Sequence, residues 1–331
     1  MANGRILIVG GYGVVGSVIA RGLRARHPHL ELVLAGREPD KASELANELG
    51  AGTAGLDVTD KPSLARATDG FDLVVGVVKD PHLALLDAAI DAQAAFITIT
   101  SGAYEPAPVF VRVLQAKPAR SVAIMPYWLA GPMTWATLDA AQDFERVDQV
   151  RMSALYDYAD PIGPMTMADA QSFGHGTALA LRDGAWTRTP VAGALARLEP
   201  NGWEPFDAQL MDALDVASVA ALTGAADVAF YLGLGQSSGT RAGGRASTDM
   251  VVEIDGAKGG ARYRTQTTII DPRGQAHLTA LGVVIAAERV IGLDGRRPPA
   301  GGLVLPETLV EPSAAVARLK SAGVHIATVT L

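Results

Sequence analysis

An apolar run that ends in a cluster of glycines constrains the fold of this chain more than any other feature. Residues 6–16 read Ile-Leu-Ile-Val-Gly-Gly-Tyr-Gly-Val-Val-Gly. The run has strand length, and the apolar residues after the glycines recur at the spacing of one helix face. A strand, a tight turn and a helix in this order hold the pyrophosphate of a dinucleotide on a helix N-terminus. We therefore predict a nucleotide-binding Rossmann unit at the start of the chain.

Three of the glycines have distinct expected roles in this unit. Gly11 permits the tight turn, Gly13 lets the backbone approach the phosphates, and Gly16 lets the helix and the strand pack closely. The alternative interpretation is a glycine-rich turn with a structural role only.

The second predicted strand, residues 31–35, ends about twenty residues after the glycine turn, where this fold recognises the ribose. An Asp or Glu is typical of NAD sites at that place, but this chain has Gly36 and Arg37. Gly36 leaves space and Arg37 supplies a cation for a 2′-phosphate, which favours NADP. In the alternative interpretation Arg37 is only solvated and Glu38 binds the ribose.

A short third strand is predicted at residues 56–58, Leu-Asp-Val. The end of this strand would border the adenine. Asp57 is then expected either to accept a hydrogen bond from the adenine amino group or to cap the next turn.

Strands and helices alternate through the rest of the first 128 residues. Residues 71–78 form an apolar run typical of a buried parallel strand, and further strands are predicted at 96–100 and 122–125. Asp80 and Pro81 predict a helix start, with Asp80 as the cap and Pro81 in the first helical position. This alternation predicts a doubly wound parallel domain over residues 1–128.

The pattern changes after residue 128. Short strands and turns, among them Arg182-Asp183-Gly184 and Asp255-Gly256, predict a mostly antiparallel sheet with covering helices over residues 129–274. Residues 275–331, which include an apolar helix at 278–291, are expected to return to the first domain. The predicted fold class is therefore α/β, a Rossmann domain with a second α+β domain. Residues 156–160, Tyr-Asp-Tyr-Ala-Asp, indicate either a polar substrate pocket or an ordinary strand end.

The composition excludes several classes of site. The 331 residues include no cysteine, which excludes disulfides, thiolate metal sites and a cysteine nucleophile. A formal net charge of −7 argues against a nucleic-acid or anionic-membrane surface. No carboxylate–histidine spacing indicates a metal site. Because the first strand is expected almost at Met1, no cleavable signal is predicted, and we expect a cytoplasmic protein. A sheet like that of the second domain commonly supplies a dimer contact, so we also expect a homodimer.

Four segments together resemble the saccharopine dehydrogenase-like family of NADP-binding reductases. They are residues 10–16, 34–37, 56–58 and 304–312, the last followed by a leucine-containing helix and Gly323. The resemblance implies NADP as the cofactor and a tail that packs on the nucleotide domain. Members commonly have an Asn- or Gly-Pro-containing turn after the fourth strand and an acidic pair after the fifth. Because this chain has Lys79-Asp80-Pro81 and Thr98–Gly102 there, the resemblance does not extend to saccharopine as the substrate.

Candidate catalytic residues follow the predicted fourth strand, because ligands of open parallel sheets bind at the carboxyl ends of strands. Lys79 is expected either to protonate a developing alkoxide or amine, to anchor a substrate carboxylate, or only to contact the nicotinamide or solvent. His82 is a second candidate proton donor, with capping or packing as the alternative. The Tyr-x-x-x-Lys pair of the short-chain dehydrogenases, the main competing family, is absent from the sequence.

These observations predict an NADP(H)-dependent oxidoreductase that transfers a hydride between nicotinamide and a small carbonyl, imine or amino-acid-like substrate. The alternative is a non-catalytic NADP(H)-binding sensor or partner-binding protein, and a third possibility is an isomerase or lyase that retains its nicotinamide. The candidate catalytic residues are Lys79 and His82. The candidate nucleotide-contacting residues are Gly10, Gly11, Tyr12, Gly13, Val14, Val15, Gly36, Arg37, Asp57, Val58, Val77, Val78, Lys79 and Ser101.

Overall fold

The chain folds into two compact units, each built from separate stretches of sequence. The computed structural model describes residues 4–99, 106–170, 175–192 and 195–331. Of these, the residues up to 126 and residues 279–310 form the first unit. Residues 127–278 and 311–331 form the second unit.

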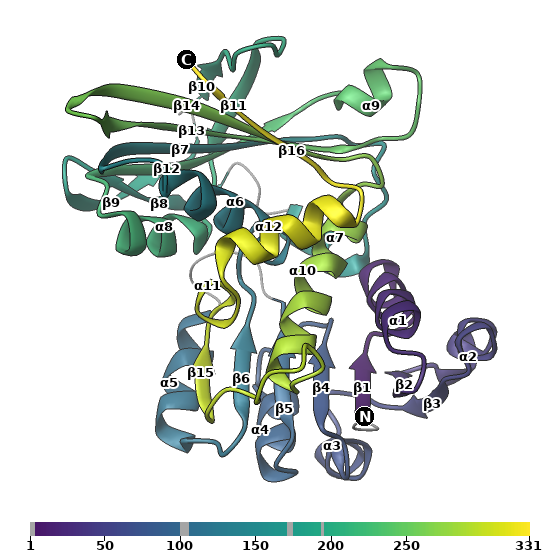
Figure 1. Cartoon of the computed structure of the whole chain (residues 1–331). Helices are drawn as coiled ribbons and strands as arrows, with labels where there is room; N and C mark the ends of the chain where they lie inside the picture. The colour runs from purple at the N-terminus through teal and green to yellow at the C-terminus, as the bar shows by residue number, and fades with distance from the viewer. Residues whose placement is uncertain (1–3, 100–105, 171–174, 193–194) are drawn as a thin grey trace. The chain divides into compact units, whose positions relative to one another are not determined.

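A seven-stranded parallel sheet forms the centre of the first unit (Figure 1). Its strand order is β15-β6-β5-β4-β1-β2-β3, so the chain reverses its direction across the sheet after β3. Apolar residues fill both faces of the central strands, as expected for a parallel sheet covered by helices on both sides. The strands are β1 (Arg5–Val9), β2 (Glu31–Gly36), β3 (Gly52–Gly55), β4 (Leu73–Gly76), β5 (Ala95–Thr98), β6 (Ser121–Ile124) and β15 (Gly302–Val304).

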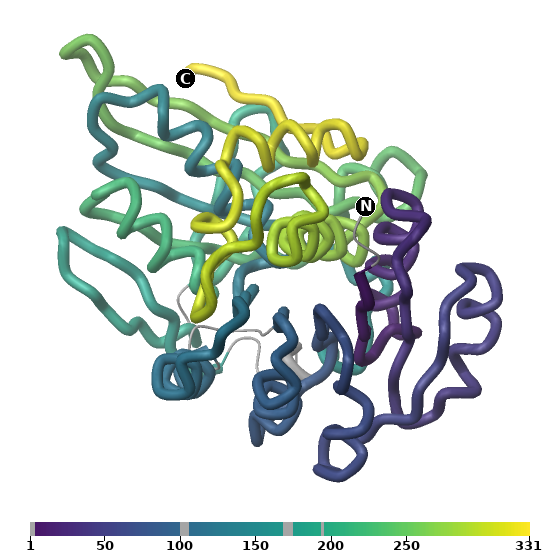
Figure 2. The backbone as a smooth tube through the Cα atoms, turned by 60° about the horizontal axis from the view of Figure 1, so that its bottom comes forward, coloured from purple at the N-terminus to yellow at the C-terminus, as the bar shows by residue number. Residues whose placement is uncertain are grey.

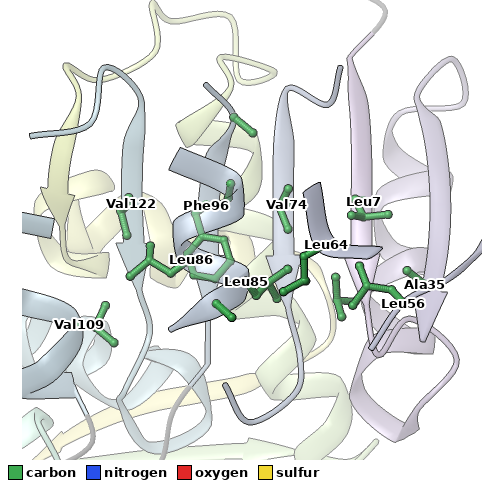
Figure 3. Close-up of a cluster of buried hydrophobic side chains, with 14 of the residues drawn as sticks. Leu7, Ala35, Leu56, Leu64, Val74, Leu85, Leu86, Phe96, Val109 and Val122 are labelled. Carbon is green, nitrogen blue, oxygen red and sulfur yellow. The ribbon is translucent and has the colours of Figure 1, made fainter. Parts of the chain in front are cut away.

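Helices cover both faces of this sheet, because right-handed crossovers on the two sides of β1 place their helices on opposite faces. Leu64, Leu85 and Val109, one from each of α3, α4 and α5, join the buried cluster in Figure 3. The helices are α1 (Val14–Arg26), α2 (Ser43–Leu49), α3 (Lys61–Thr68), α4 (Ala84–Asp91), α5 (Pro106–Ala116), α10 (Gln275–Val290) and α11 (Pro306–Leu309), with a 3₁₀ turn at Pro39–Ala42.

α1 and the part of α10 from Thr279 onward lie side by side (Figures 1 and 2). A Cβ on Gly22 of α1 would lie only 3.2 Å from Cγ2 of Val284, so the small residue allows the close approach. The Glu288 carboxylate, 1% exposed, accepts a hydrogen bond from Arg26 Nε at 2.5 Å and contacts His27 Nε2 at 2.8 Å. These contacts hold the carboxyl end of α1 against α10.

A nine-stranded sheet forms the second unit. Its main order is β10-β11-β12-β7-β13-β14-β16, and β8 joins β12 and pairs with β9. β7 and β12 pair in parallel, whereas the other strand pairs described are antiparallel. The strands are β7 (Arg146–Tyr156), β8 (Thr177–Arg182), β9 (Ala185–Pro190), β10 (Leu195–Leu198), β11 (Phe206–Leu210), β12 (Asp227–Leu234), β13 (Thr248–Lys258), β14 (Ala261–Asp271) and β16 (His325–Thr330). The predicted α/β class, with a doubly wound domain and a second domain on a mostly antiparallel sheet, is confirmed.

Most side chains of α6 are buried in the second unit, between α12 and the sheet. The other helices are shorter or peripheral. Among the residues that the structure describes, no helix has both the length and the apolar character needed to cross a bilayer. The helices are α6 (Pro132–Ala141), α7 (Pro164–Ala170), α8 (Asp215–Thr223), α9 (Ser238–Arg241) and α12 (Pro312–Ser321), with a 3₁₀ turn at Trp128–Ala130.

The carboxyl-terminal segment divides between the two units, whereas the sequence predicts that all of residues 275–331 return to the first domain. Residues 279–310 lie in the first unit, where β15 pairs with β6. Residues 311–331 lie in the second unit, because α12 packs against α6 and β16 pairs with β14. The tail therefore belongs to the first unit only as far as Val310.

Two local predictions about strands are wrong. β3 is Gly52–Gly55 and not the predicted 56–58, because the edge strand is small and mostly exposed while the buried Leu56 follows it. Asp255 and Gly256 do not form a turn; they lie inside β13 at a shift in its register with β7. The chain turns instead at Gly259 and Gly260, both with positive φ. The turn predicted at Asp183-Gly184 does join β8 to β9.

Candidate functional site

The turn between β1 and α1 has a conformation that only glycine permits. Gly10 has φ +82°, and a Cβ there would lie 2.8 Å from the Val77 carbonyl oxygen. A Cβ on Gly16 would lie 2.2 Å from the Gly10 carbonyl oxygen, closer than any real contact. Gly10 is thus the left-handed residue of the turn. Gly11 cannot carry a side chain without a shift in the structure, because a Cβ there would lie 2.8 Å from Ile8 O.

The N-terminus of α1 is open to an anion. Gly13, the residue before the helix, is extended and has no side chain that could accept from the first amides. The first turn of α1 contains no acidic residue. Helix N-termini carry N–H groups without intrahelical partners and a partial positive charge. The backbone here therefore fits a phosphate group, and a Cβ at position 16 would collide with the turn that presents these amides.

Tyr12 lies over the end of β2. A Cβ on Gly36 would lie 2.4 Å from the Tyr12 hydroxyl oxygen, and that hydroxyl accepts a hydrogen bond from Glu38 N at 3.1 Å. Gly36 therefore makes room for the Tyr12 ring. Arg37, the next residue, is exposed.

Asp57 lies close enough to Arg37 for their charges to interact. Its Oδ1 accepts hydrogen bonds from Thr59 N at 2.9 Å and Thr59 Oγ1 at 2.8 Å. These bonds, and more weakly the Arg37 guanidinium, hold the pKa of the Asp57 carboxyl below its usual value. The turn-capping role expected as one alternative is thus present, and contact with adenine remains a prediction for Asp57 and the half-buried Val58.

The end of β4 meets the glycine turn. Val77 N donates to Val9 O at 2.9 Å, and Val78 Cγ1 would lie 3.0 Å from a Cβ on Gly10. The structure thus brings the predicted residues Val77 and Val78 beside the predicted turn. Lys79 follows them and is exposed. Ser101 lies outside the described residues.

The helix start predicted at Asp80 and Pro81 is wrong. α4 begins at Ala84, after Leu83 in the left-handed region at φ 55°. Asp80 caps the helix from outside: its carboxylate accepts from Ala84 N at 2.9 Å and Leu85 N at 2.8 Å. The turn between Asp80 and the helix lets one carboxylate reach amides four and five residues ahead.

His82 lines a groove between α3 and α4 on the helical layer of the first unit. Lys61 and Arg66 of α3 and Asp87 and Asp91 of α4 line the same groove. The structure therefore does not group His82 with the residues around the glycine turn. Its proposed role as a proton donor has no contact in support among the described residues.

A second polar site lies within the second unit. Trp128, Tyr156, Asp160, Thr248 and Gln275 are among the residues that line a small cavity there. Three members of the predicted polar patch, Tyr156, Asp157 and Asp160, thus line this cavity. Tyr158, the patch's other aromatic residue, is instead 73% exposed.

Asp157 and Asp160 have opposite electrostatic surroundings. Although burial opposes ionisation, hydrogen bonds from Thr240, Ala159 and Ser237 lower the pKa of Asp157 to about 2. Burial raises the pKa of Asp160 to about 6, against the hydrogen bond from Gln275 N and the charge of Arg245. Asp160 Oδ2 accepts that bond at 2.7 Å. Asp160 is thus able to exchange a proton near neutral pH, which Asp157 is not.

The amino-terminal region matches a known family. Residues 6–141 match the model of the saccharopine dehydrogenase NADP binding domain. This region is similar to that domain. The resemblance predicted from the sequence is confirmed.

Solved structures share the fold of the whole chain. Apo saccharopine dehydrogenase (L-Glu forming) from Saccharomyces cerevisiae is similar at a TM-score of 0.76 and 12% identity, covering 99% of this chain and 100% of that chain. A probable dehydrogenase from Thermotoga maritima is similar at a TM-score of 0.51 and 14% identity, covering 98% of each chain. At these identities the likeness shows the fold alone. A comparison with curated proteins finds no match.

The match to a saccharopine dehydrogenase NADP binding domain supports an NAD(P)-dependent oxidoreductase. The matched region includes the glycine turn, Arg37 and Lys79, but of the cavity-lining residues named above only Trp128. Sequence reasoning missed Thr248 and Gln275, because no local pattern marks a strand residue or a helix start as part of a pocket. Within the described residues, no group of three or more His, Cys, Asp or Glu side chains is placed to hold a metal ion.

Proposed function

We propose that this chain is an NADP(H)-dependent oxidoreductase acting on a small carbonyl, imine or amino-acid-like substrate. The observation that carries the proposal is the glycine turn with its open helix N-terminus. A Cβ on Gly16 would collide with the turn at 2.2 Å from Gly10 O, and no acidic residue opposes a phosphate in the first turn of α1. When bound, the nicotinamide would supply or accept the hydride.

The residues of the first unit would divide the work of holding this cofactor. The amides at the start of α1 would bind the pyrophosphate, and Arg37 would pair with the 2′-phosphate. Tyr12 and Gly36 would form the wall beside the ribose. Lys79, exposed at the end of β4, would contact the nicotinamide end, donate a proton or anchor a substrate carboxylate.

Calorimetry with NADPH and NADH tests the assignment of Arg37. Arg37→Ala is expected to raise the Kd for NADPH about 10- to 100-fold, the effect of losing a charge-assisted hydrogen bond. The Kd for NADH should change by no more than about 2-fold, because NADH has no 2′-phosphate. Arg66→Ala, an exposed arginine in the last turn of α3, is the matched control and should change neither value. Equal weakening of both nucleotides by Arg37→Ala would show that Arg37 does not read the phosphate.

Cofactor consumption distinguishes the proposed enzyme from its alternatives. A steady loss of NADPH absorbance with a small carbonyl or imine substrate is expected of the reductase. Tight binding without turnover across such a panel would instead favour a sensor, and product without net NADPH change would favour an isomerase or lyase. No affinity for either nucleotide would overturn the proposal altogether.

We further propose that the protein acts in the cytoplasm as a homodimer. The mostly antiparallel second sheet is the surface on which we expect the two copies to meet. Light scattering on the purified protein tests this assembly, and a monomer at micromolar concentration would contradict it.

A further inference from the structure

Two buried polar atoms of residues at the cavity of the second unit have no hydrogen-bond partner among the described residues. They are Nε1 of Trp128 and Oγ1 of Thr248, and both residues line the cavity together with Asp160. Thr248 is 7% exposed and Asp160 is 5% exposed. An unpaired buried donor or hydroxyl destabilises the fold, so native proteins normally satisfy such groups.

Other unpartnered buried atoms in this chain differ in their setting. Trp135 Nε1 and Thr265 Oγ1 also lack partners among the described residues, but neither residue lines the cavity. Trp135 is 0% exposed and Thr265 is 1% exposed, so both are enclosed by packed side chains. Trp128 and Thr248, by contrast, both line one cavity together with Asp160.

The backbone holds Trp128 in place. Trp128 N donates to Asp215 Oδ2 at 2.7 Å, and Thr134 Oγ1 donates to Asp215 Oδ1 at 2.7 Å. The Trp128 ring packs on Phe230 with centroids 5.6 Å apart. The following residue, Leu129, has φ 54°, a conformation that side chains rarely adopt. Trp128, which lines the cavity, is therefore held in place through both its backbone and its ring.

The size of the cavity and the types of its polar atoms select one kind of ligand atom. Its volume of about 10 Å³ holds the centre of one water-sized atom. The Trp128 indole is only a donor, so the ligand atom must accept a hydrogen bond. An ammonium or a protonated imine cannot accept one. An oxygen can, and a hydroxyl oxygen can also exchange hydrogen bonds with Thr248 and Asp160.

We propose that this cavity binds a single carbonyl or hydroxyl oxygen of a small molecule through Trp128, Thr248 and Asp160, with water in its place when no ligand is bound. The identification of this oxygen as part of the substrate rests on the proposed oxidoreductase function. At the atom held in this cavity, the site favours a carbonyl or hydroxyl oxygen over an ammonium or a protonated imine. Asp160 is then the residue positioned to exchange a proton with that oxygen.

The indole N–H resonance of Trp128 in the ¹⁵N-labelled full chain tests the proposal. Trp128→Phe identifies the resonance by its loss. Acetone, 2-propanol and 2-propylammonium are the probes, because they share one carbon skeleton. Acetone and 2-propanol are expected to shift the resonance saturably, and 2-propylammonium is not. Absence of a saturable shift, or an equal shift by the ammonium, would overturn the proposal.

Matched variants separate the site from general packing. Thr248→Val is expected to weaken acetone binding about 3- to 10-fold, the effect of one neutral hydrogen bond. Thr248→Ser, which keeps the hydroxyl, should restore the affinity and covers the case in which the valine variant fails to fold. Thr265→Val and Trp135→Phe remove equally buried, equally unpartnered atoms away from the cavity and should leave acetone binding unchanged. Equal weakening by Thr265→Val would contradict a specific site.

The measurement needs no nucleotide, so its failure is distinguishable from failure of the proposed function. A chain that binds NADPH but shows no response to acetone refutes the oxygen site alone. A chain that responds to acetone but binds neither nucleotide refutes the oxidoreductase and leaves a site for a carbonyl or alcohol oxygen.

Discussion

The glycine turn of the first unit and the polar cavity of the second are built in different ways. The turn uses seven consecutive residues, 10–16, and its candidate ligand groups are backbone amides. The cavity uses side chains from Trp128, the end of β7, the start of β13 and the start of α10, which are up to 147 residues apart in sequence. One site depends on the shape of the backbone, and the other on which side chains converge.

This difference decides which substitutions each site tolerates without losing its ligand. A backbone site tolerates no added atom, because the carbonyl groups around it cannot move away. A side-chain site tolerates changes in shape but not the removal of a donor or a charge. We therefore expect substitutions in the turn to weaken ligand binding through steric clashes. Substitutions at the cavity are expected to weaken it by removing a charge or a hydrogen bond.

The largest expected effect is that of Gly16→Ala on nucleotide affinity. The added Cβ would lie 2.2 Å from Gly10 O, a backbone atom that no rotamer change can move. We expect the Kd for NADPH to rise at least about 100-fold, which is about 3 kcal/mol, when measured by calorimetry.

Gly22→Ala is the control for this change. It adds the same atom to the same helix, but its nearest neighbour is the side chain of Val284 at 3.2 Å. Circular dichroism shows whether both variants keep their secondary structure. A Gly16→Ala variant that binds NADPH normally would show that the turn is not the phosphate site.

Asp157→Asn is expected to have the next largest effect, on stability. Asp157 is 4% exposed, and its carboxylate accepts from Ser237 N and Oγ, both at 2.8 Å, and from Ala159 N at 2.9 Å. An amide cannot accept all of these bonds. Urea unfolding at pH 7 should show a loss of about 2 to 3 kcal/mol.

The sign of this effect follows from the pKa. The pKa of Asp157 is about 2 in the fold, below its ordinary value of 3.8, so ionisation favours the folded state. That contribution is present above about pH 3.8 and is lost as the pH falls through about 2. Asp207→Asn, an exposed carboxylate on β11, should cost far less at pH 7. A similar loss in both variants would mean that the hydrogen bonds of Asp157 do not stabilise the end of β7.

The same contrast explains how much the sequence could predict. β1, the turn, α1 and β2 follow from residues within one short stretch, and the predicted bounds 31–35 differ from β2 by one residue. The helix start predicted at Asp80-Pro81 and the turn predicted at Asp255-Gly256 are wrong, because a longer-range contact overrides a valid local signal at each place. Asp80 caps a later helix start, and β7 pairs with β13 on both sides of Asp255-Gly256.

The cavity lay beyond sequence reasoning for the same reason. The patch at Tyr156–Asp160 indicated polarity, but its partners Trp128 and Thr248 have no pattern that distinguishes them from core residues. Trp135 and Thr265, with the same chemistry, are buried but do not line this cavity. Only the pairing of β7 with β13 brings Thr248 near Asp160, because that pairing places the start of β13 beside the end of β7.

The smallest expected effect, and the sharpest test of the cavity's electrostatics, is the pH dependence of Asp160→Asn. Burial raises the pKa of Asp160 to about 6, above its ordinary value of 3.8, so the protonated carboxyl favours the folded state. This stabilisation is fully present below about pH 3.8 and is lost as the pH rises through about 6. Between pH 5 and pH 8 the wild type should therefore lose about 1 kcal/mol of stability relative to Asp160→Asn.

Neighbouring groups determine how this experiment must be read. Arg245, Asp157 and Asp271 act on Asp160 through their charges, and Asp271 in turn contacts His277 Nδ1 at 2.5 Å. Because His277 is present in both proteins, the difference between wild type and Asp160→Asn in urea unfolding isolates Asp160 to first order. Asp69→Asn, on an exposed carboxylate at the end of α3, corrects for the loss of one negative charge. A difference between wild type and Asp160→Asn that stays constant from pH 5 to pH 8 would mean that Asp160 is ionised throughout. It could not then deliver a proton to a bound oxygen, and the cavity would be a binding site without acid–base chemistry.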